Sequence, residues 1–382
     1  MSQNYQSIVT DIKMKIKHEY IRELTVDTDD FFGVPYPYTI PEKETRSALY
    51  YWETYFTNLG LIKMRMVDQA RHNVENLVYL LRNIGYVPAS NKKSLSLEIS
   101  LPMLPWMVRD VYRATGDKEW LRRVLPDIIK EYHYWTLKPH TSPTGLYRFA
   151  PLSEAFKEAI VQDIAVNWAH QPRFEKVEDI NPVDLNALLY RNARIIFDLQ
   201  IETDGHGDQN LLQKSDQMQR LMEICWSNSD GFYYDNDIPA KRLSPIKHLS
   251  SFLPLFVEMV DEKRARRMAN HLKSFIQPGG LSNGEKGTGQ FHSVWEYPYI
   301  TPPYMYMIIK GLCDYEMMED AADIGTNWIN MVLNIYQETG DFWEWYNVAD
   351  RTINSPHGLP NYPNMGWSVG TFIALHNALG LD

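Results

Sequence analysis

Apolar residues recur along most of the chain at the spacing of one face of an α-helix. The i, i+3, i+4, i+7 pattern occurs in three separate stretches, 74–81, 218–225 and 329–336. A longer apolar stripe runs through residues 117–132, where Gly116 and Asp117 supply a helix start signal. The pattern predicts an all-α protein.

Glycine-led turns separate these predicted helices. Gly145, Gly231, Gly280 and Gly340 each precede hydrophobic residues, and the gaps between them are irregular. Irregular gaps exclude a strict short repeat and suit helical hairpins with loops of variable length. At roughly 30 residues per helix and loop, the chain accommodates about a dozen helices. A closed double ring of six helical hairpins meets that number.

Composition narrows the classes of partner. The 382 residues carry a formal net charge of -10, spread along the chain, and a nucleic-acid partner would need a basic face instead. No stretch approaches the roughly 18 apolar residues of a membrane span, and the first residues show no apolar run behind a basic segment. We therefore expect a cytoplasmic protein with neither a nucleic-acid nor a membrane partner. Oligomeric state is not predicted.

The sequence lacks the motifs of phosphate-binding, dinucleotide-binding, zinc-protease and serine-hydrolase sites. The chain has no phosphate-binding GxxxxGK[ST] loop, no dinucleotide-binding GxGxxG, no HExxH, no CxxC and no GxSxG. No histidine pairs with a carboxylate at a ligand-like spacing, and the two cysteines lie in helix-like stretches. We therefore expect neither a cofactor nor a metal.

Three tryptophans are each followed directly by a glutamate within an aromatic loop. These pairs are Trp52-Glu53, Trp295-Glu296 and Trp343-Glu344. Aromatic rings stack on the C–H faces of pyranoses, carboxylates bind their hydroxyls, and partial burial raises a carboxyl pKa toward that of a general acid. The pairs therefore indicate carbohydrate chemistry. The alternative is that each tryptophan packs in the core while its glutamate faces solvent or caps a helix.

At these loops the chain resembles the trehalases, glycoside hydrolase family 37, and more distantly the family 63 α-glucosidases. The resemblance rests on ordered motifs along nearly the whole chain: LYYWETYF at 49–56, INPVDLNALLY at 180–190, DGFYYD at 230–235, TGQ at 288–290 with WEYP at 295–298, EWYNV at 344–348 and GWS at 366–368. It implies an (α/α)6 barrel. Residues 1–382 would then form one catalytic domain, with residues 1–45 as an N-terminal extension packed on the barrel.

The resemblance also implies an inverting glycosidase with two catalytic carboxyl groups. Position by position, it assigns Asp163 as the general acid and Glu344 as the general base. It further implies a set of residues that contact a small carbohydrate ligand: Arg46, Trp52, Glu53, Asn91, Glu154, Trp168, Trp295, Glu296, Tyr346 and Trp367.

Several departures from the family pattern bear on the substrate. Residues 45–48 and 97–102 lack two arginines and a glutamine that bind glucose hydroxyls in trehalases, and Glu53 and Glu296 replace aspartates. Such changes alter which ligand is bound, so we expect a small α-glucoside or related glycoside other than trehalose. Two alternatives stay open: a repurposed barrel that performs acid-base chemistry on a non-glycoside or binds sugar without turnover, and a scaffold with a vestigial cavity.

Overall fold

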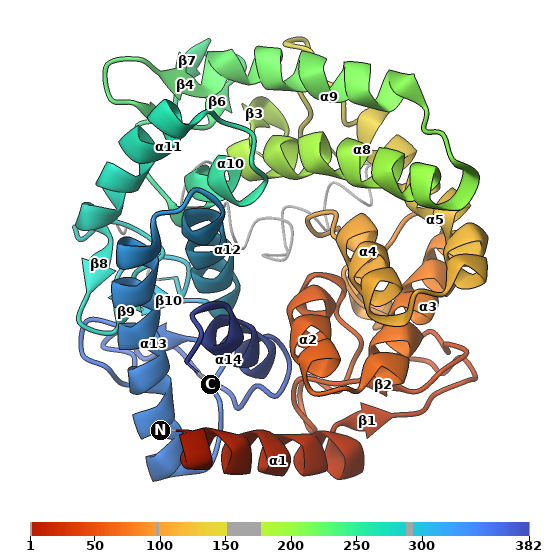
Figure 1. Cartoon of the computed structure of the whole chain (residues 1–382), viewed down its shortest axis with the longest axis vertical. Coiled ribbons are helices and arrows are strands. Elements are labelled where there is room, and N and C mark those ends of the chain that lie inside the picture. The colour runs from red at the N-terminus through yellow and green to blue at the C-terminus, as the bar shows by residue number, and fades with distance from the viewer. Residues whose placement is uncertain (1, 97–98, 151–176, 288–292, 382) are drawn as a thin grey trace.

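The computed structural model describes residues 2–96, 99–150, 177–287 and 293–381. Within these residues, helices form two concentric rings (Figure 1). The inner ring consists of α2 (Tyr51–Lys63), α4 (Leu104–Thr115), α8 (Val183–Asp204), α10 (Leu253–Phe256), α12 (Pro302–Asp314) and α14 (Trp367–Ala378). The outer ring consists of α1 (Ser2–Glu19), α3 (Val67–Ile84), α5 (Lys118–Thr136), α9 (Gln209–Leu221), α11 (Glu262–Ala269) and α13 (Met318–Thr339).

The inner ring is closed. Each inner helix packs against the next in chain order, and the last, α14, packs against the first, α2. Helices α2, α4, α8 and α12 also pack against the outer helix that follows them, so these pairs are antiparallel hairpins. The architecture predicted from the sequence, an (α/α)6 barrel, is confirmed.

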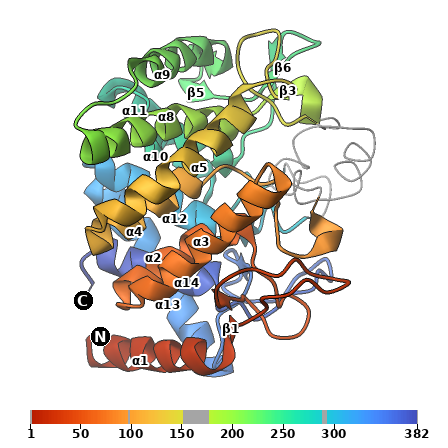
Figure 2. The ribbon, with the colours of Figure 1, turned by 90° about the vertical axis from the view of Figure 1, so that its right-hand side faces the viewer.

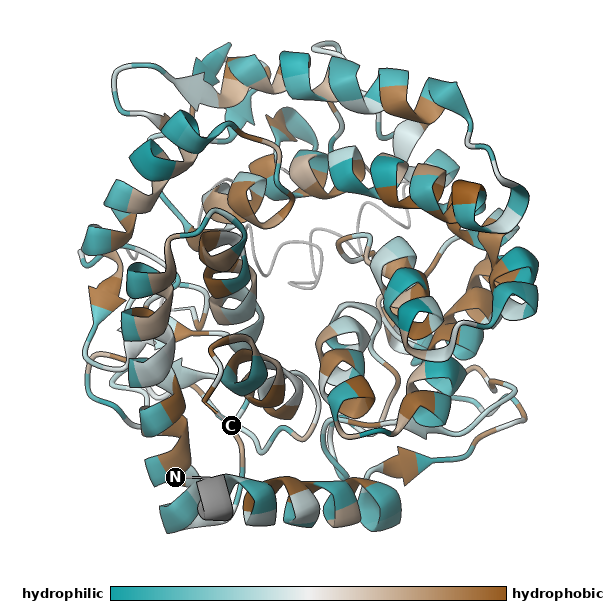
Figure 3. Cartoon of the chain, in the orientation of Figure 1, coloured by the Kyte–Doolittle hydropathy of each residue, from teal (hydrophilic) through white to brown (hydrophobic). Residues whose placement is uncertain are grey.

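The two rings differ in the pattern of their side chains. Helices α12 and α14 are buried on nearly every side, because each is enclosed by two ring neighbours and by outer helices. Outer helices such as α3 and α5 bury one apolar stripe and expose the opposite face. Figure 3 shows the corresponding division, with hydrophobic faces toward the inside of the double ring. The periodicity that predicts helices from the sequence comes mainly from the outer ring.

The two ends of the barrel differ in their connections. Turns from an inner to an outer helix are short and contain a residue in the left-handed conformation, such as Arg65, Glu258 or Glu316. Connections from an outer to the next inner helix are long and contain short elements. The 3-10 helices are η1 (Lys93–Leu95), η2 (Val177–Asp179), η3 (Met222–Cys225), η4 (Leu249–Phe252) and η5 (Asn270–Ser274). In Figure 2 the two termini lie together at the end opposite strands β1, β3 and β6.

The strands are two residues long and form antiparallel pairs. The pairs are β1 (Ile21–Arg22) with β2 (Tyr38–Thr39), β4 (Trp226–Ser227) with β5 (Phe232–Tyr233), β8 (Ile276–Gln277) with β9 (Gly280–Leu281), and β10 (Tyr299–Ile300) with β11 (Tyr346–Asn347). Strand β6 (Asn236–Asp237) pairs with both β3 (Ile180–Asn181) and β7 (Arg242–Leu243). Two of these ladders, β3 with β6 and β10 with β11, join neighbouring long connections, and the others fold a single connection back on itself.

Helix α1 crosses the place where the ring closes. Its Lys13 Nζ donates a hydrogen bond of 2.9 Å to the carbonyl oxygen of Met64, in the turn after α2. On the other side, Asp11 accepts a hydrogen bond from the Tyr336 hydroxyl of α13, and Tyr5 stacks on His376 of α14. The first residues of the chain therefore bind both the first and the last helical hairpin.

Candidate functional site

An arginine joins two carboxylates that are far apart in the sequence. Glu53 lies in the first turn of α2, and Glu344 lies in the connection between α13 and α14. Arg46 Nη2 is 3.2 Å from Glu53 Oε2, and Arg46 Nη1 donates a hydrogen bond to Glu344 Oε1. Because the Arg46 cation binds both carboxylates, it offsets the repulsion between two negative side chains in one site. The structure thus brings together three of the residues that the sequence analysis predicted.

Glu53 is held rigidly by the start of α14. Its Oε1 accepts a hydrogen bond of 2.6 Å from Asn364 Nδ2 and a weaker one of 3.3 Å from the Trp367 backbone N–H. A Cβ at Gly366 would lie 2.5 Å from the same oxygen, so only glycine allows this approach. Burial raises the pKa of Glu53, while Arg46 and the hydrogen bond from Asn364 oppose the rise. Glu53 is a fixed, desolvated carboxyl group.

Glu344 is fixed mainly through its backbone. Its N–H donates to the carbonyl of Tyr362, and its carbonyl accepts from Trp367 Nε1 at 3.0 Å. Its side chain is 22% exposed, against 5% for Glu53. The two carboxylates therefore differ in accessibility: Glu53 is buried and bound on both oxygens, whereas the Glu344 side chain is partly exposed.

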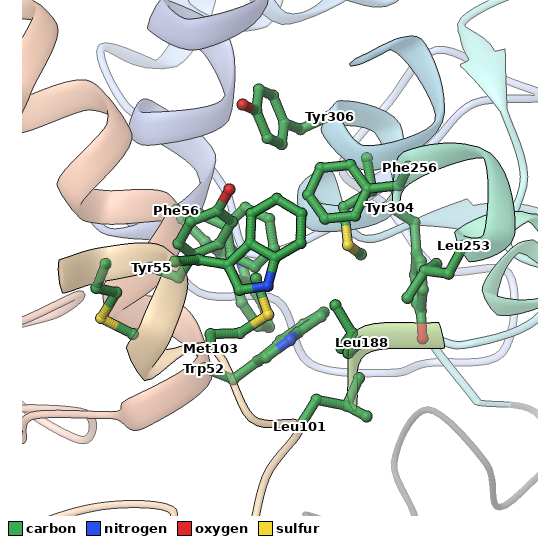
Figure 4. Packing of buried hydrophobic residues seen from close by; sticks show 14 of the residues in the cluster. Trp52, Tyr55, Phe56, Leu101, Met103, Leu188, Leu253, Phe256, Tyr304 and Tyr306 are labelled. Atoms are coloured by element: carbon green, nitrogen blue, oxygen red, sulfur yellow. The ribbon is translucent and has the colours of Figure 1, made fainter. Parts of the chain in front are cut away.

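Aromatic rings pack directly beside this carboxylate pair. The Trp52 ring lies 6.0 Å from those of Trp367 and Tyr304 and 6.4 Å from that of Trp295, measured between centroids. The predicted sugar-stacking rings are buried: Trp52 and Trp367 are each 2% exposed and Trp295 is 4% exposed. The three rings form one aromatic cluster, since Trp295 also lies 6.4 Å from Trp367, and Figure 4 shows Trp52 next to Met103.

Two residues that the sequence analysis missed hold the loop with Trp295 and Glu296. His248 Nε2 donates to the carbonyl of Trp295 at 3.0 Å, and its Nδ1 accepts from the Ser250 N–H. Asn283 Nδ2 donates to the carbonyl of Val294 at 2.9 Å. Neither residue belongs to a sequence motif. His248 binds a carbonyl 47 residues away, and Asn283 binds one 11 residues away within the same long connection.

Asn364 was also missed. Its Oδ1 accepts hydrogen bonds from the N–H groups of Gly366 and Ser368, at the start of α14. Gly366 is the N-cap residue of α14, and Asn364, two residues earlier, supplies the side-chain acceptor that the glycine lacks. Its amide nitrogen then binds Glu53.

The remaining predicted contact residues fall into two groups. Asn91 is fully buried, where its side chain accepts from the Leu49 N–H and donates to the carbonyl of Phe32. The Tyr346 hydroxyl accepts from the Trp343 N–H at 3.0 Å and so supports the loop that carries Glu344. Glu154, Asp163 and Trp168 lie outside the residues that the structure describes.

The chain is similar to trehalases over most of its length. The sequence model of the trehalase family matches residues 1–152 and 169–378. The periplasmic trehalase of Pseudomonas aeruginosa is 27% identical over 91% of this chain and 72% of its own length. That of Escherichia coli O1:K1 is 24% identical over 92% of this chain and 70% of its own length. Residues 153–168, which contain Asp163, fall between the two matched stretches.

Solved structures agree on the fold. A neutral trehalase from Saccharomyces cerevisiae superposes with a TM-score of 0.75 at 20% identity, covering 91% of this chain and 76% of its own. A family 63 mannosylglycerate hydrolase from Thermus thermophilus, solved in complex with glucose, gives 0.69 at 15% identity over 98% of this chain and 100% of its own.

One expectation is wrong. From the sequence we expect a cytoplasmic protein, whereas the bacterial relatives are named periplasmic trehalases. Among the described residues, no helix has the length and apolar character needed to cross a membrane. The family resemblance itself is confirmed, since the matched stretches cover most of the chain and include Arg46, Glu53, Glu344 and Trp367. The chain therefore belongs to the trehalase family and is an inverting glycoside hydrolase.

Proposed function

We propose that the protein hydrolyses a small α-glucoside or related glycoside other than trehalose. In this proposal Glu344 is the general base and Asp163 is the general acid. The observation that carries the proposal is the pairing of Glu53 and Glu344 through Arg46 at the long-loop end of the barrel. Such a pair offers one rigid carboxylate to bind hydroxyls and one accessible carboxylate to activate water.

The reaction balances with two carboxyl groups. A water oxygen attacks the anomeric carbon and gives its proton to Glu344 as the glycosidic C–O bond breaks. The departing oxygen takes a proton from Asp163. Since water must fit between the base and the sugar, we expect the two carboxyl groups to stand roughly 6.5–9.5 Å apart. The product then carries the inverted anomeric configuration.

The substrate assignment rests on the altered polar groups. Glu53 and Glu296 each carry one methylene more than the family's aspartates, and residues 45–48 and 97–102 lack the family's arginines and glutamine. Both Glu53 oxygens are already bound, by Asn364 and by Arg46, so its position is set before any ligand arrives. A sugar matched to trehalase contacts would leave buried polar groups unpaired here, which costs about 1–3 kcal/mol each.

The test is hydrolysis of a glycoside panel followed by NMR of the first-formed anomer. The panel contains trehalose, kojibiose, nigerose, maltose, isomaltose, sucrose, glucosylglycerate and nitrophenyl glycosides. On the substrate that is cleaved, Glu344→Gln and Asp163→Asn should each lower kcat by about 10²–10⁴-fold, because each keeps the shape and removes the proton-transfer group.

Two matched substitutions serve as controls. Glu338→Gln, on the exposed face of α13, and Asp179→Asn, in η2, should leave kcat within about twofold of wild type. Full activity in Asp163→Asn would remove that residue from the mechanism, and trehalose as the best substrate would overturn the substrate assignment. Retained configuration at the anomeric carbon would contradict direct attack of water on the anomeric carbon.

A further inference from the structure

A cavity opens at the end of the barrel opposite to the carboxylate pair. Its volume is about 510 Å³, and its walls come from the C-terminal halves of α2, α4, α12 and α14. The carboxylate pair lies at the N-terminal ends of α2 and α14. Lys63 follows Trp52 by eleven positions in α2, which corresponds to about 16 Å along the helix axis. The cavity is within the size range of small-molecule sites, about 300–1,000 Å³.

A plug of aromatic side chains separates this cavity from the carboxylate pair. The Trp106 and Phe256 rings stack at 4.7 Å, and the Tyr306 ring lies 6.2 Å from those of Phe56 and Phe256. Figure 4 shows Tyr55, Phe56, Phe256 and Tyr306 directed toward one another inside the ring. All of these side chains are buried. The cavity is therefore separate from the carboxylate pair.

The cavity combines an apolar surface with positive charge. Most of its lining is apolar, contributed by Leu59, Ile62 and the alanines Ala114, Ala374 and Ala378. The charged lining residues are four cations, Lys63, Arg109, Arg113 and Lys310, and one carboxylate, Asp110. This excess of cations contrasts with the net charge of -10 of the whole chain. A local positive field in an acidic protein favours an anionic ligand.

Two of the four cations, Lys63 and Arg113, are exposed and have no carboxylate partner within the described part of the chain. Arg109 binds Asp110, with Nε 2.9 Å from Oδ1, and Lys310 pairs with Asp314. Lys63 Nζ instead donates to a neutral group, Asn377 Oδ1, at 2.6 Å. Arg113 makes no side-chain hydrogen bond or ion pair with any residue that the structure describes. Lys63 and Arg113 lie on the adjacent helices α2 and α4, beside the apolar wall.

We propose that this cavity binds a small amphipathic anion, a carboxylate carried on an apolar body. The apolar wall covers the body, and Lys63 and Arg113 receive the carboxylate through charge-assisted hydrogen bonds. The proposal is independent of the glycosidase mechanism, because it involves none of the residues at the carboxylate pair.

The test is calorimetric titration of the whole protein with octanoate and, separately, with neutral octanol. Octanoate should bind one to one with a Kd of roughly 0.1–1 mM, and octanol at least about tenfold more weakly. Lys63→Gln and Arg113→Gln should each weaken octanoate binding about five- to tenfold. Arg266→Gln, an exposed arginine on α11, is the matched control and should bind as wild type does.

A steric variant tests the location. Ala378→Phe, at an exposed position of the lining, places a ring in the cavity without removing a charge, and should abolish binding while circular dichroism stays unchanged. Octanoate binding by Ala378→Phe at wild-type affinity would overturn the site. Equal affinities for octanol and octanoate, or charge variants that bind like Arg266→Gln, would overturn the recognition of an anion. Absence of any octanoate binding would overturn the proposal altogether.

Discussion

At the scale of single residues, glutamates that look equivalent in the sequence differ in burial and in hydrogen bonding. Glu344 is partly exposed, Glu53 is buried but bound on both oxygens, and Glu131 of α5 is buried with one oxygen that has no hydrogen-bond partner among the described residues. Glu131 Oε1 accepts a hydrogen bond from the Tyr51 hydroxyl, which itself accepts from the N–H groups of Met103 and Leu104. A carboxyl group in such surroundings binds its proton more tightly than one in water.

Glu131 should therefore make the stability of the protein depend on pH. Burial raises its pKa to about 8 from an ordinary 4.5. Between these values the folded state holds a proton that the unfolded state has lost, so the free energy of unfolding falls as pH rises from about 5 to 8. Glu131→Gln removes this dependence, and should become more stable than wild type by a few kcal/mol at pH 8 but not at pH 5.

Urea unfolding of both proteins at pH 5, 6.5 and 8 measures the difference. Glu338→Gln, an exposed substitution, should follow the wild-type curve at every pH. A constant difference between Glu131→Gln and wild type across this range would show that Glu131 has the same pKa in both states.

At the scale of elements, the sequence predicts helices well and the site only in part. Residues 74–81, 117–132 and 329–336 lie in or at the start of α3, α5 and α13, and Asp117 caps α5 through the Trp120 N–H. At 218–225 the apolar pattern continues beyond α9 into η3, because spacing alone does not distinguish an α-helix from a following 3-10 turn. The two-residue strands leave no period to detect.

Residues of the candidate site could be predicted where they belong to a sequence motif. Residues that join the site through a backbone contact could not. Arg46, Glu53 and Glu344 were found because each lies in or next to a recognisable loop, and the structure joins them. His248 binds a backbone carbonyl of another connection and Asn283 binds one within its own, and only the fold creates those contacts. Burial of Trp52 and Trp295 likewise follows from ring closure and not from local sequence.

Asn364 connects an element to the site, so its loss should affect both. Asn364→Ala removes the hydrogen bonds to two N–H groups at the start of α14 and the one to Glu53, which should destabilise the protein by about 1–3 kcal/mol. Activity should fall as well, because Glu53 loses one of the groups that fix it.

Asn354→Ala provides the comparison for this substitution. Asn354 lies in the same connection, and among the described residues its side chain makes no hydrogen bond. Thermal unfolding and kcat should stay near wild type in Asn354→Ala and fall in Asn364→Ala. Similar values for the two variants would mean that Asn364 does not hold Glu53.

At the scale of the whole molecule, the contact between α2 and α14 closes the ring. A Cβ at Gly60 would lie 2.8 Å from the Gly370 Cα, and a Cβ at Gly370 would overlap with the carbonyl of Phe56. The two helices thus meet backbone to backbone. Such a contact cannot yield as a flexible side chain does.

Gly370→Ala should accordingly force α2 and α14 apart at this contact, called here the seam. We expect a loss of about 1–3 kcal/mol or more in the free energy of unfolding, in spite of the roughly 1 kcal/mol that alanine gains over glycine in a helix. Gly325→Ala in α13 is the matched control, because its Cβ would come closest to the end of the Leu379 side chain, 2.5 Å away, which can move. Equal stabilities of the two variants, measured by urea unfolding, would contradict a close-packed seam.

The contact between α2 and α14 also constrains the order in which the protein folds during synthesis on the ribosome. Glu53 emerges early, yet its partners Asn364 and Trp367 emerge more than 300 residues later, at sequence separations of 311 and 314. The preceding hairpins must wait as an open arc until α14 arrives to bridge the ends, while α1 contacts groups on both sides of the gap. Long waiting with apolar faces uncovered invites association with other chains. Nascent molecules of this enzyme should therefore depend on chaperones until the last helix is released, and the carboxylate pair should be the last part of the molecule to assemble.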